Sequence, residues 1–274
     1  MEHILGVDIS EYQQGIDFDR LMEEGASFAI LRGGDGGYKD KCFDGFYAEA
    51  RERGLPVGAY WFSRATTQRA AREEALDFYS RCLAGRQFEL PVYMDVEAEK
   101  LKNLGADALG GVIQAWCDTL RERNFCVGVY TNTNWLQNHL DFDALHGIEL
   151  WIAQWSVREP TRAHGMWQFG GETNLLRSNT MAGRVVDQNY MRVDYPARIR
   201  AAGHNGFEKE EEAMQAPIRY HGLEEVPSWA RQELEALVRS GALRGDEKGD
   251  LNLSEDMLRT LLVAKRYADG LISG

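Results

Sequence analysis

The sequence is poor in basic residues. Lys and Arg number 31 against 43 Asp and Glu, so the 274-residue chain carries a formal net charge of -12. Proteins that bind nucleic acid gain most of their affinity from clustered Lys and Arg. Here the arginines are interleaved with acids. We therefore expect no nucleic-acid partner.

Long apolar runs are also missing. No stretch of the sequence is apolar enough to cross a bilayer. The first residues, Met1 to Gly6, lack the basic residues and the apolar run of a secretion signal. We expect no membrane insertion, and synthesis in the cytoplasm without a signal peptide.

Cysteine is scarce, and no two cysteines have the spacing of a metal knuckle. The four are Cys42, Cys82, Cys117 and Cys126, all in the first half of the chain. This distribution favours ordinary thiols in a reducing compartment. A domain of this size needs no disulfides, although the four could pair.

From residue 3 to about residue 195, short β-prone runs alternate with amphipathic segments of helical length. This pattern is typical of a parallel sheet covered by helices. The predicted strands are 3–8, 28–32, 57–62, 91–97, 126–131, 150–154, 166–169 and 184–189. The predicted helices are 18–24, 43–53, 67–83 and 106–123.

Eight strands with helices mainly between the first five predict an α/β fold, a modified TIM-type β/α barrel. A doubly wound sheet is the competing architecture. Such a sheet would carry a glycine-rich turn after the first strand, whereas Asp8 is followed by the residues ISEY. The barrel is therefore favoured, and its functional residues would lie at the C-terminal strand ends.

The composition changes after residue 200, where a glycine-containing stretch precedes the acidic run 208–212. We predict a catalytic barrel at 1–200, a linker at 201–225 and a small helical domain at 226–274. Ser228 and Ser254 are candidate caps for the two helices of that domain. Two short helices make a thin core, so the domain would pack on the barrel, on a second copy or on a ligand.

Carboxylates end three of the predicted strands. Asp8 ends the first, Asp95 and Glu97 the fourth, and Asp187 the eighth. Because side chains alternate along a strand, Asp95 and Glu97 would share a face, with Cα atoms roughly 6.5–7 Å apart. Crowded carboxylates raise one another's pKa, and an acid beside a carboxylate is what glycosidic cleavage requires.

Two other interpretations of these acids stay open. Strand-end carboxylates also serve as helix caps or ion-pair partners, and clustered oxygens also suit Mg²⁺ or Ca²⁺. No His joins the cluster, which argues against a zinc or iron site. We expect neither a metal nor a cofactor.

Aromatic residues follow or end the same predicted strands, as a sugar-binding groove would require. The candidate substrate-binding residues are Tyr12, Tyr60, Trp61, Tyr130, Trp155 and Gln168, which follows Trp167. Such rings are also common in protein cores. Their strand-end position favours Tyr60, Tyr130 and Trp155 as site residues.

Seven segments together resemble, in the right order, glycoside hydrolase family 25, the Chalaropsis-type lysozymes. They are GVDIS (6–10), GAYWF (58–62), MDVE (94–97), GVYTN (128–132), IAQW (152–155), WQF (167–169) and VDQN (186–189). The resemblance covers about residues 3–195. Family members often carry His where this chain has Trp61, which puts a polar role at that position in doubt.

The resemblance implies a modified β/α barrel that cleaves the β-1,4 bond between N-acetylmuramic acid and N-acetylglucosamine in bacterial peptidoglycan, with retention. Glu97 would be the proton donor. Asp95 would be its partner, stabilising the ring cation or orienting the substrate's acetamido group. Asp8 and Asp187 would orient and tune the pair, and the aromatic residues and Gln168 would line the saccharide groove.

Residues 226–270 loosely resemble a small helical module at the ends of bacterial and bacteriophage wall lytic enzymes, which implies wall attachment or self-association as a homo-oligomer. We therefore expect an endolysin-like muramidase that reaches the cell wall after release from the host cytoplasm. Two alternatives are a related glycosidase acting on chitin-like polymers and a barrel that binds glycans without cleaving them.

Overall fold

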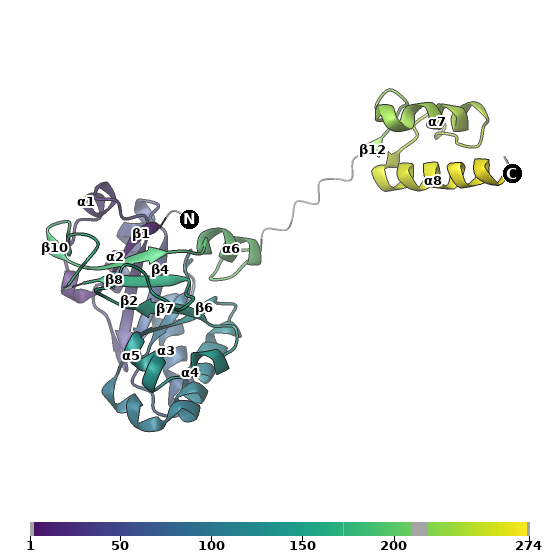
Figure 1. Cartoon of the computed structure of the whole chain (residues 1–274). Helices are drawn as coiled ribbons and strands as arrows, with labels where there is room; N and C mark the ends of the chain where they lie inside the picture. Colours follow the sequence, from purple (N-terminus) through teal and green to yellow (C-terminus); the bar gives the residue numbers. More distant parts are fainter. Residues whose placement is uncertain (1–2, 172, 210–218, 273–274) are drawn as a thin grey trace. The chain divides into compact units, whose positions relative to one another are not determined.

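The structure is a computed structural model that describes residues 3–171, 173–209 and 219–272. The chain divides into two compact units, Met1–Glu210 and Glu211–Gly274. The larger unit contains a barrel of strands with helices around it, and the smaller one contains two helices (Figure 1).

Eight strands of the larger unit close into a barrel, as the sequence predicts. In spatial order they are β1 (Ile4–Ile9), β11 (Asp187–Met191), β8 (Met166–Gly170), β7 (Glu149–Ala153), β6 (Val127–Asn132), β5 (Val92–Asp95), β4 (Val57–Phe62) and β2 (Ala29–Asp35). Pairing of β1 with β2 closes the ring. A two-residue strand, β3 (Tyr38–Lys39), extends the sheet beside β2.

Strand β11 runs against its neighbours. It is antiparallel to β1 and to β8, whereas the other neighbouring strands of the ring are parallel. The prediction of one strand over 184–189 is wrong, because β10 (Arg184–Val185) pairs with β9 (Thr180–Met181) in a separate hairpin. A parallel connection requires a long crossover, usually a helix, and the segment before β11 has none.

Four helices connect the first strands in the predicted order. They are α1 (Phe18–Glu23), α2 (Phe43–Glu52), α3 (Gln68–Phe78), which continues as a π-helical turn (Tyr79–Leu83), and α4 (Ala106–Arg121). Two helices of the barrel unit were not predicted, α5 (Thr133–Asn138) and α6 (Tyr195–Ala202). Helix α5 escapes sequence analysis because its six residues are too few to show an apolar period.

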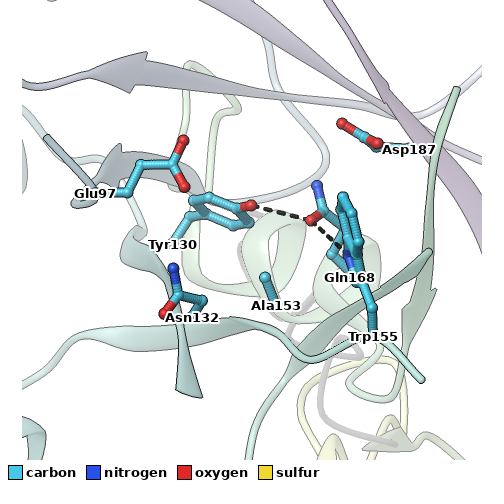
Figure 2. Close-up of a pocket in the computed structure, with 7 residues that line it drawn as sticks. All are labelled: Glu97, Tyr130, Asn132, Ala153, Trp155, Gln168 and Asp187. Carbon is cyan, nitrogen blue, oxygen red and sulfur yellow. Dashed lines mark hydrogen bonds between the residues drawn. The ribbon is translucent and has the colours of Figure 1, made fainter. Parts of the chain in front are cut away.

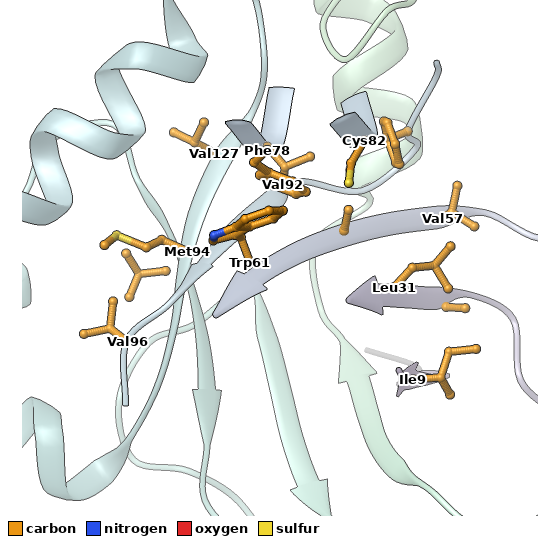
Figure 3. Close-up of a cluster of buried hydrophobic side chains, with 14 of the residues drawn as sticks. Ile9, Leu31, Val57, Trp61, Phe78, Cys82, Val92, Met94, Val96 and Val127 are labelled. Atoms are coloured by element: carbon orange, nitrogen blue, oxygen red, sulfur yellow. The ribbon is translucent and has the colours of Figure 1, made fainter. Parts of the chain in front are cut away.

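Side-chain alternation divides the buried apolar residues of the barrel unit into two clusters. One cluster fills the barrel, and Trp151, Tyr93 and Tyr195 are its largest fully buried rings. The other lies between the strands and the surrounding helices and includes Trp61 and Phe78 (Figure 3). Glycines on the inner faces leave room for the rings: a Cβ on Gly128 would lie 2.4 Å from Tyr93.

The chain that follows α6 belongs to the barrel unit. Asn205 is fully buried, and its side-chain amide donates to the carbonyls of Phe88 and Leu90 while its oxygen accepts from the backbone N–H of Cys126. The predicted linker therefore starts too early. Residues 210–218, which include part of the acidic run, lie outside the described residues.

The smaller unit has its own apolar core. Strand β12 (Arg219–Tyr220) pairs with β13 (Leu253–Ser254), and helices α7 (Ser228–Arg239) and α8 (Glu255–Ile272) pack together. The core includes Leu234, Leu258 and Leu262. Ser254 accepts from the backbone N–H of Met257 at 3.2 Å, as a cap should, whereas Ser228 is the first residue of α7 and makes no cap.

Within the part of the chain that the structure describes, no helix combines the length and the apolar character that a membrane span needs.

Candidate active site

The predicted acids meet at one end of the barrel. Asp8 lies near the end of β1, and Asp95 is the last residue of β5. Asp187 opens β11 rather than closing a strand, but it reaches the same end because β11 is reversed. Asp8 and Asp187 are direct partners in the β1–β11 register.

Glu97 follows β5 by two residues and keeps the inward direction of Asp95. Between them, the backbone N–H of Val96 donates to the carbonyl of Tyr130 at 2.9 Å, and the hydroxyl of Thr131 donates to the carbonyl of Val96 at 2.7 Å. These two bonds hold the segment extended beyond the end of the strand. The alternation of side chains therefore continues as far as Glu97.

Asp95 is the most deeply buried of the acids that line the site. Its side chain is 3% exposed, and no described protein group hydrogen-bonds its Oδ1 atom. Burial raises the pKa of Asp95 well above its ordinary value, and the negative charge of Glu97 raises it further. Burial followed by the charge of Asp8 also raises the pKa of half-buried Glu97. The pair therefore retains a proton to a higher pH than carboxyl groups in water do.

Two amide side chains donate hydrogen bonds to Asp8. Its Oδ2 atom accepts from Gln168 Nε2 at 3.0 Å and from Asn189 Nδ2 at 2.8 Å. The oxygen of Asn189 accepts in turn from the indole N–H of Trp151 at 2.8 Å. Burial raises the pKa of Asp8 to about 6, although both amide hydrogen bonds oppose the rise.

Two adjoining pockets share Glu97 and Asp187. One has a volume of about 440 Å³ and is shown in Figure 2. Its lining residues are Glu97, Tyr130, Asn132, Ala153, Trp155, Gln168 and Asp187. The other, of about 350 Å³, is lined by residues that include Asp8, Tyr12, Tyr60 and Asp95. Glu97 thus lies where the two pockets meet.

The structure brings five of the six predicted substrate-binding residues to these pockets. Tyr130, Trp155 and Gln168 line the first, and Tyr12 and Tyr60 line the second. The expectation for Trp61 is wrong: its side chain is fully buried and packs against Phe78. Tyr60 faces the barrel interior, so its neighbour on the strand must face the helices.

Several lining residues were not predicted from the sequence. Asn132 lines the first pocket, and Arg32, Asp35 and Arg64 line the second. Arg64 donates twice to Asp35, at 2.6 and 2.8 Å. Alternation along β6 could have revealed Asn132, because it lies two residues after Tyr130. Alternation along β2 could likewise have revealed Arg32, which lies two residues after inward-facing Ile30. Arg64 lies beyond the end of β4 and carried no comparable signal.

The described residues contain no group of three or more His, Cys, Asp or Glu side chains arranged to hold a metal ion. All four cysteines are free thiols. Burial raises the pKa of Cys82 to about 12, so this side chain stays protonated and is not a reactive thiolate.

The fold and site define a barrel with buried carboxylates in a pocket lined by aromatic rings, an arrangement suited to cleaving glycosidic bonds. Comparison with known sequences agrees. Residues 7–176 match the sequence model of glycosyl hydrolases family 25, and the chain belongs to this family.

Three known proteins illustrate the similarity. The autolytic lysozyme of Clostridium acetobutylicum is 28% identical over 57% of this chain, and the match spans 46% of that relative's length. Lysozyme M1 of Streptomyces globisporus is 24% identical, over 74% of this chain and 72% of the relative. Among solved structures, the CTP1L endolysin has a TM-score of 0.61 and 25% identity, over 72% of this chain and 69% of that one.

Proposed function

We propose that this protein is a lysozyme that hydrolyses the β-1,4 bond between N-acetylmuramic acid and N-acetylglucosamine in peptidoglycan. The observation that carries the proposal is the position of Glu97, a half-buried acid with a raised pKa at the junction of two pockets. A glycan lying across the junction would present its scissile oxygen to Glu97. Two of the similar proteins are themselves named lysozymes.

In this mechanism Glu97 protonates the leaving oxygen and later activates the attacking water. Asp95 lies beneath it, and its Oδ1 atom has no protein partner within the described chain. The Asp95 carboxylate, which lines the second pocket, can stabilise positive charge on the sugar ring or orient the substrate's acetamido group. Retention follows if the Asp95 carboxylate or the substrate's acetamido oxygen attacks the anomeric carbon as the leaving oxygen departs, because water then displaces that group from the opposite face. Asp8 and Asp187 tune the charge around the pair.

The whole chain is proposed to act as an endolysin-like enzyme on the cell wall. The similarity to the CTP1L endolysin supports this role. The smaller unit, with its own core, would attach the enzyme to the wall or join two copies. A wall-binding function would explain why a compact unit accompanies a barrel that already contains the complete acidic site.

The products of digestion test the reaction assignment. Purified walls treated with the enzyme should yield fragments with N-acetylmuramic acid at the new reducing ends, as identified by mass spectrometry after borohydride reduction. New ends carrying N-acetylglucosamine, or faster release from chitin than from walls, would assign the enzyme to a different glycosidase activity. Binding to walls without new reducing ends would indicate a barrel that binds glycans without cleaving them.

A further inference from the structure

The amide of Asn132 has a fixed orientation. Asn132 ends β6 and caps α5, and its Oδ1 atom accepts from the backbone N–H groups of Asn134 at 3.0 Å and Trp135 at 3.3 Å. The amide nitrogen must therefore point the other way, toward Tyr130 and Glu97, as Figure 2 shows. No described protein group accepts a hydrogen bond from this nitrogen, so Asn132 presents a donor to the pocket.

The hydroxyl of Tyr130 has the opposite character. The indole N–H of Trp155 can only donate, and its partner at 3.2 Å is Oε1 of Gln168. This contact fixes the Gln168 amide, whose nitrogen then donates to Asp8. Tyr130 donates its hydroxyl proton to the same Oε1 atom at 2.9 Å (Figure 2). Since that proton is already used, the Tyr130 oxygen presents lone pairs to the pocket.

We propose that Asn132 and Tyr130 form a recognition pair for the 2-acetamido group of a sugar. Asn132 Nδ2 donates to the acetamido carbonyl, and Tyr130 Oη accepts from the acetamido N–H. This inference rests on the proposed function, because it concerns how the same groove selects its sugar.

The spacing of the two residues fits an amide. The carbonyl and N–H of a secondary amide point in opposite directions, so their partners must lie on either side of it. Tyr130 and Asn132 share the inner face of β6, with Cα atoms roughly 6.5–7 Å apart. Ala153 is the register partner of Asn132 on β7 and lines the same pocket. Its small side chain leaves space for the acetamido methyl group.

The pair discriminates because a simpler group cannot satisfy both residues. A hydroxyl at the same sugar carbon could reach one partner and would leave the other unpaired. A site built to hydrogen-bond a particular group disfavours analogues that lack it, since its polar groups then lose their water without gaining a partner. An ammonium group can donate to Tyr130 but offers nothing to the Asn132 amide.

The test compares chitotetraose, here the tetramer of N-acetylglucosamine, with its fully de-N-acetylated counterpart. The full-length chain carries Glu97→Gln so that neither sugar is cleaved. Affinities are measured by calorimetry in that background and after adding Tyr130→Phe or Asn132→Ser. Serine keeps a capping oxygen for α5 but lacks the amide donor. We expect each added substitution to weaken chitotetraose binding about 5- to 10-fold. Binding of the de-N-acetylated sugar should change by less than about 2-fold.

Tyr47→Phe is the matched control, because Tyr47 lines neither pocket of the site and losing its hydroxyl should not alter the binding of either sugar. Melting temperatures establish that each variant is folded. Unchanged chitotetraose affinity in both variants, or equal loss for the two sugars, would overturn the inference. The lysozyme proposal would survive such a failure if the wild-type chain still releases N-acetylmuramic acid ends from walls. The recognition pair and the lysozyme activity are therefore tested separately.

Discussion

At the scale of single residues, the site depends on buried carboxyl groups. Burial lets these groups keep their protons to a higher pH than carboxyl groups in water. Asp8, Asp95 and Glu97 all have raised pKa values, with burial as the largest cause. Each charge that forms also opposes the next one. A groove with three such groups can donate a proton at one position while it holds a negative charge at another.

The raised pKa of Asp8 predicts a specific dependence of stability on pH. A carboxyl whose pKa rises from 3.8 to about 6 on folding favours the folded state below pH 3.8, and this contribution is lost as pH rises through about 6. The Asp8→Asn variant lacks that titration but keeps an oxygen for Gln168 and Asn189. Between pH 4.5 and 7 its free energy of unfolding should therefore fall less than that of the wild type, by about 2 kcal/mol.

Urea denaturation at the two pH values measures this difference. A parallel fall in the two proteins would show that Asp8 is already ionised at pH 4.5 in the folded state.

The four acids could be predicted from the sequence because each lies within two residues of a strand boundary and strand periodicity fixes the direction of its side chain. The same periodicity shows why Trp61 was misplaced. Tyr60 and Trp61 are consecutive in β4, so they cannot both face the groove, and the fully buried side chain is that of Trp61. The position of Asp187 was foreseen for the wrong reason, since it depends on the reversal of β11.

At the scale of elements, the residues after α6 pack against the chain that leads into β5 and β6. Their glycines and charged residues predict a linker. The groups that Asn205 contacts lie too far away in the chain to leave a local sequence pattern. Asn205 bonds to groups at Phe88, Leu90 and Cys126. Such tertiary contacts make the stretch part of the folded barrel unit although its composition is typical of a linker.

Two truncations test this boundary. A barrel ending at residue 209 keeps Asn205 and should unfold cooperatively near the melting temperature of the larger unit in the full chain. A barrel ending at residue 200 leaves the backbone groups of Phe88, Leu90 and Cys126 without their partner, and should lose about 3 kcal/mol or more of unfolding free energy. Equal melting temperatures for the two truncated chains would contradict the assignment.

At the scale of the whole molecule, the two units have separate cores and separate tasks in the proposed function. The acidic site lies entirely within the larger unit. All the residues that line the two pockets belong to Met1–Glu210. The barrel alone should therefore hydrolyse glycan, whereas stable binding of the enzyme to intact walls should require both units.

The chain ending at residue 209 should cleave short soluble glycan strands at a rate within about 3-fold of the full chain, since deletion of a separate unit leaves the site unchanged. Its sedimentation with intact cell walls should decrease markedly, or its oligomeric state should change. Light scattering and a wall pull-down distinguish these outcomes. If neither property differs from that of the full chain, the smaller unit has no role in wall attachment or self-association.

The central claim is that Glu97 is the proton donor, and Glu97→Gln tests it most directly. Glutamine preserves the shape of the side chain and removes the transferable proton. Lysis of purified walls, followed by turbidity, should fall by a factor of about 100 to 10,000, while chitotetraose affinity stays within about 3-fold of the wild type. Undiminished lysis by a folded Glu97→Gln variant would contradict the account.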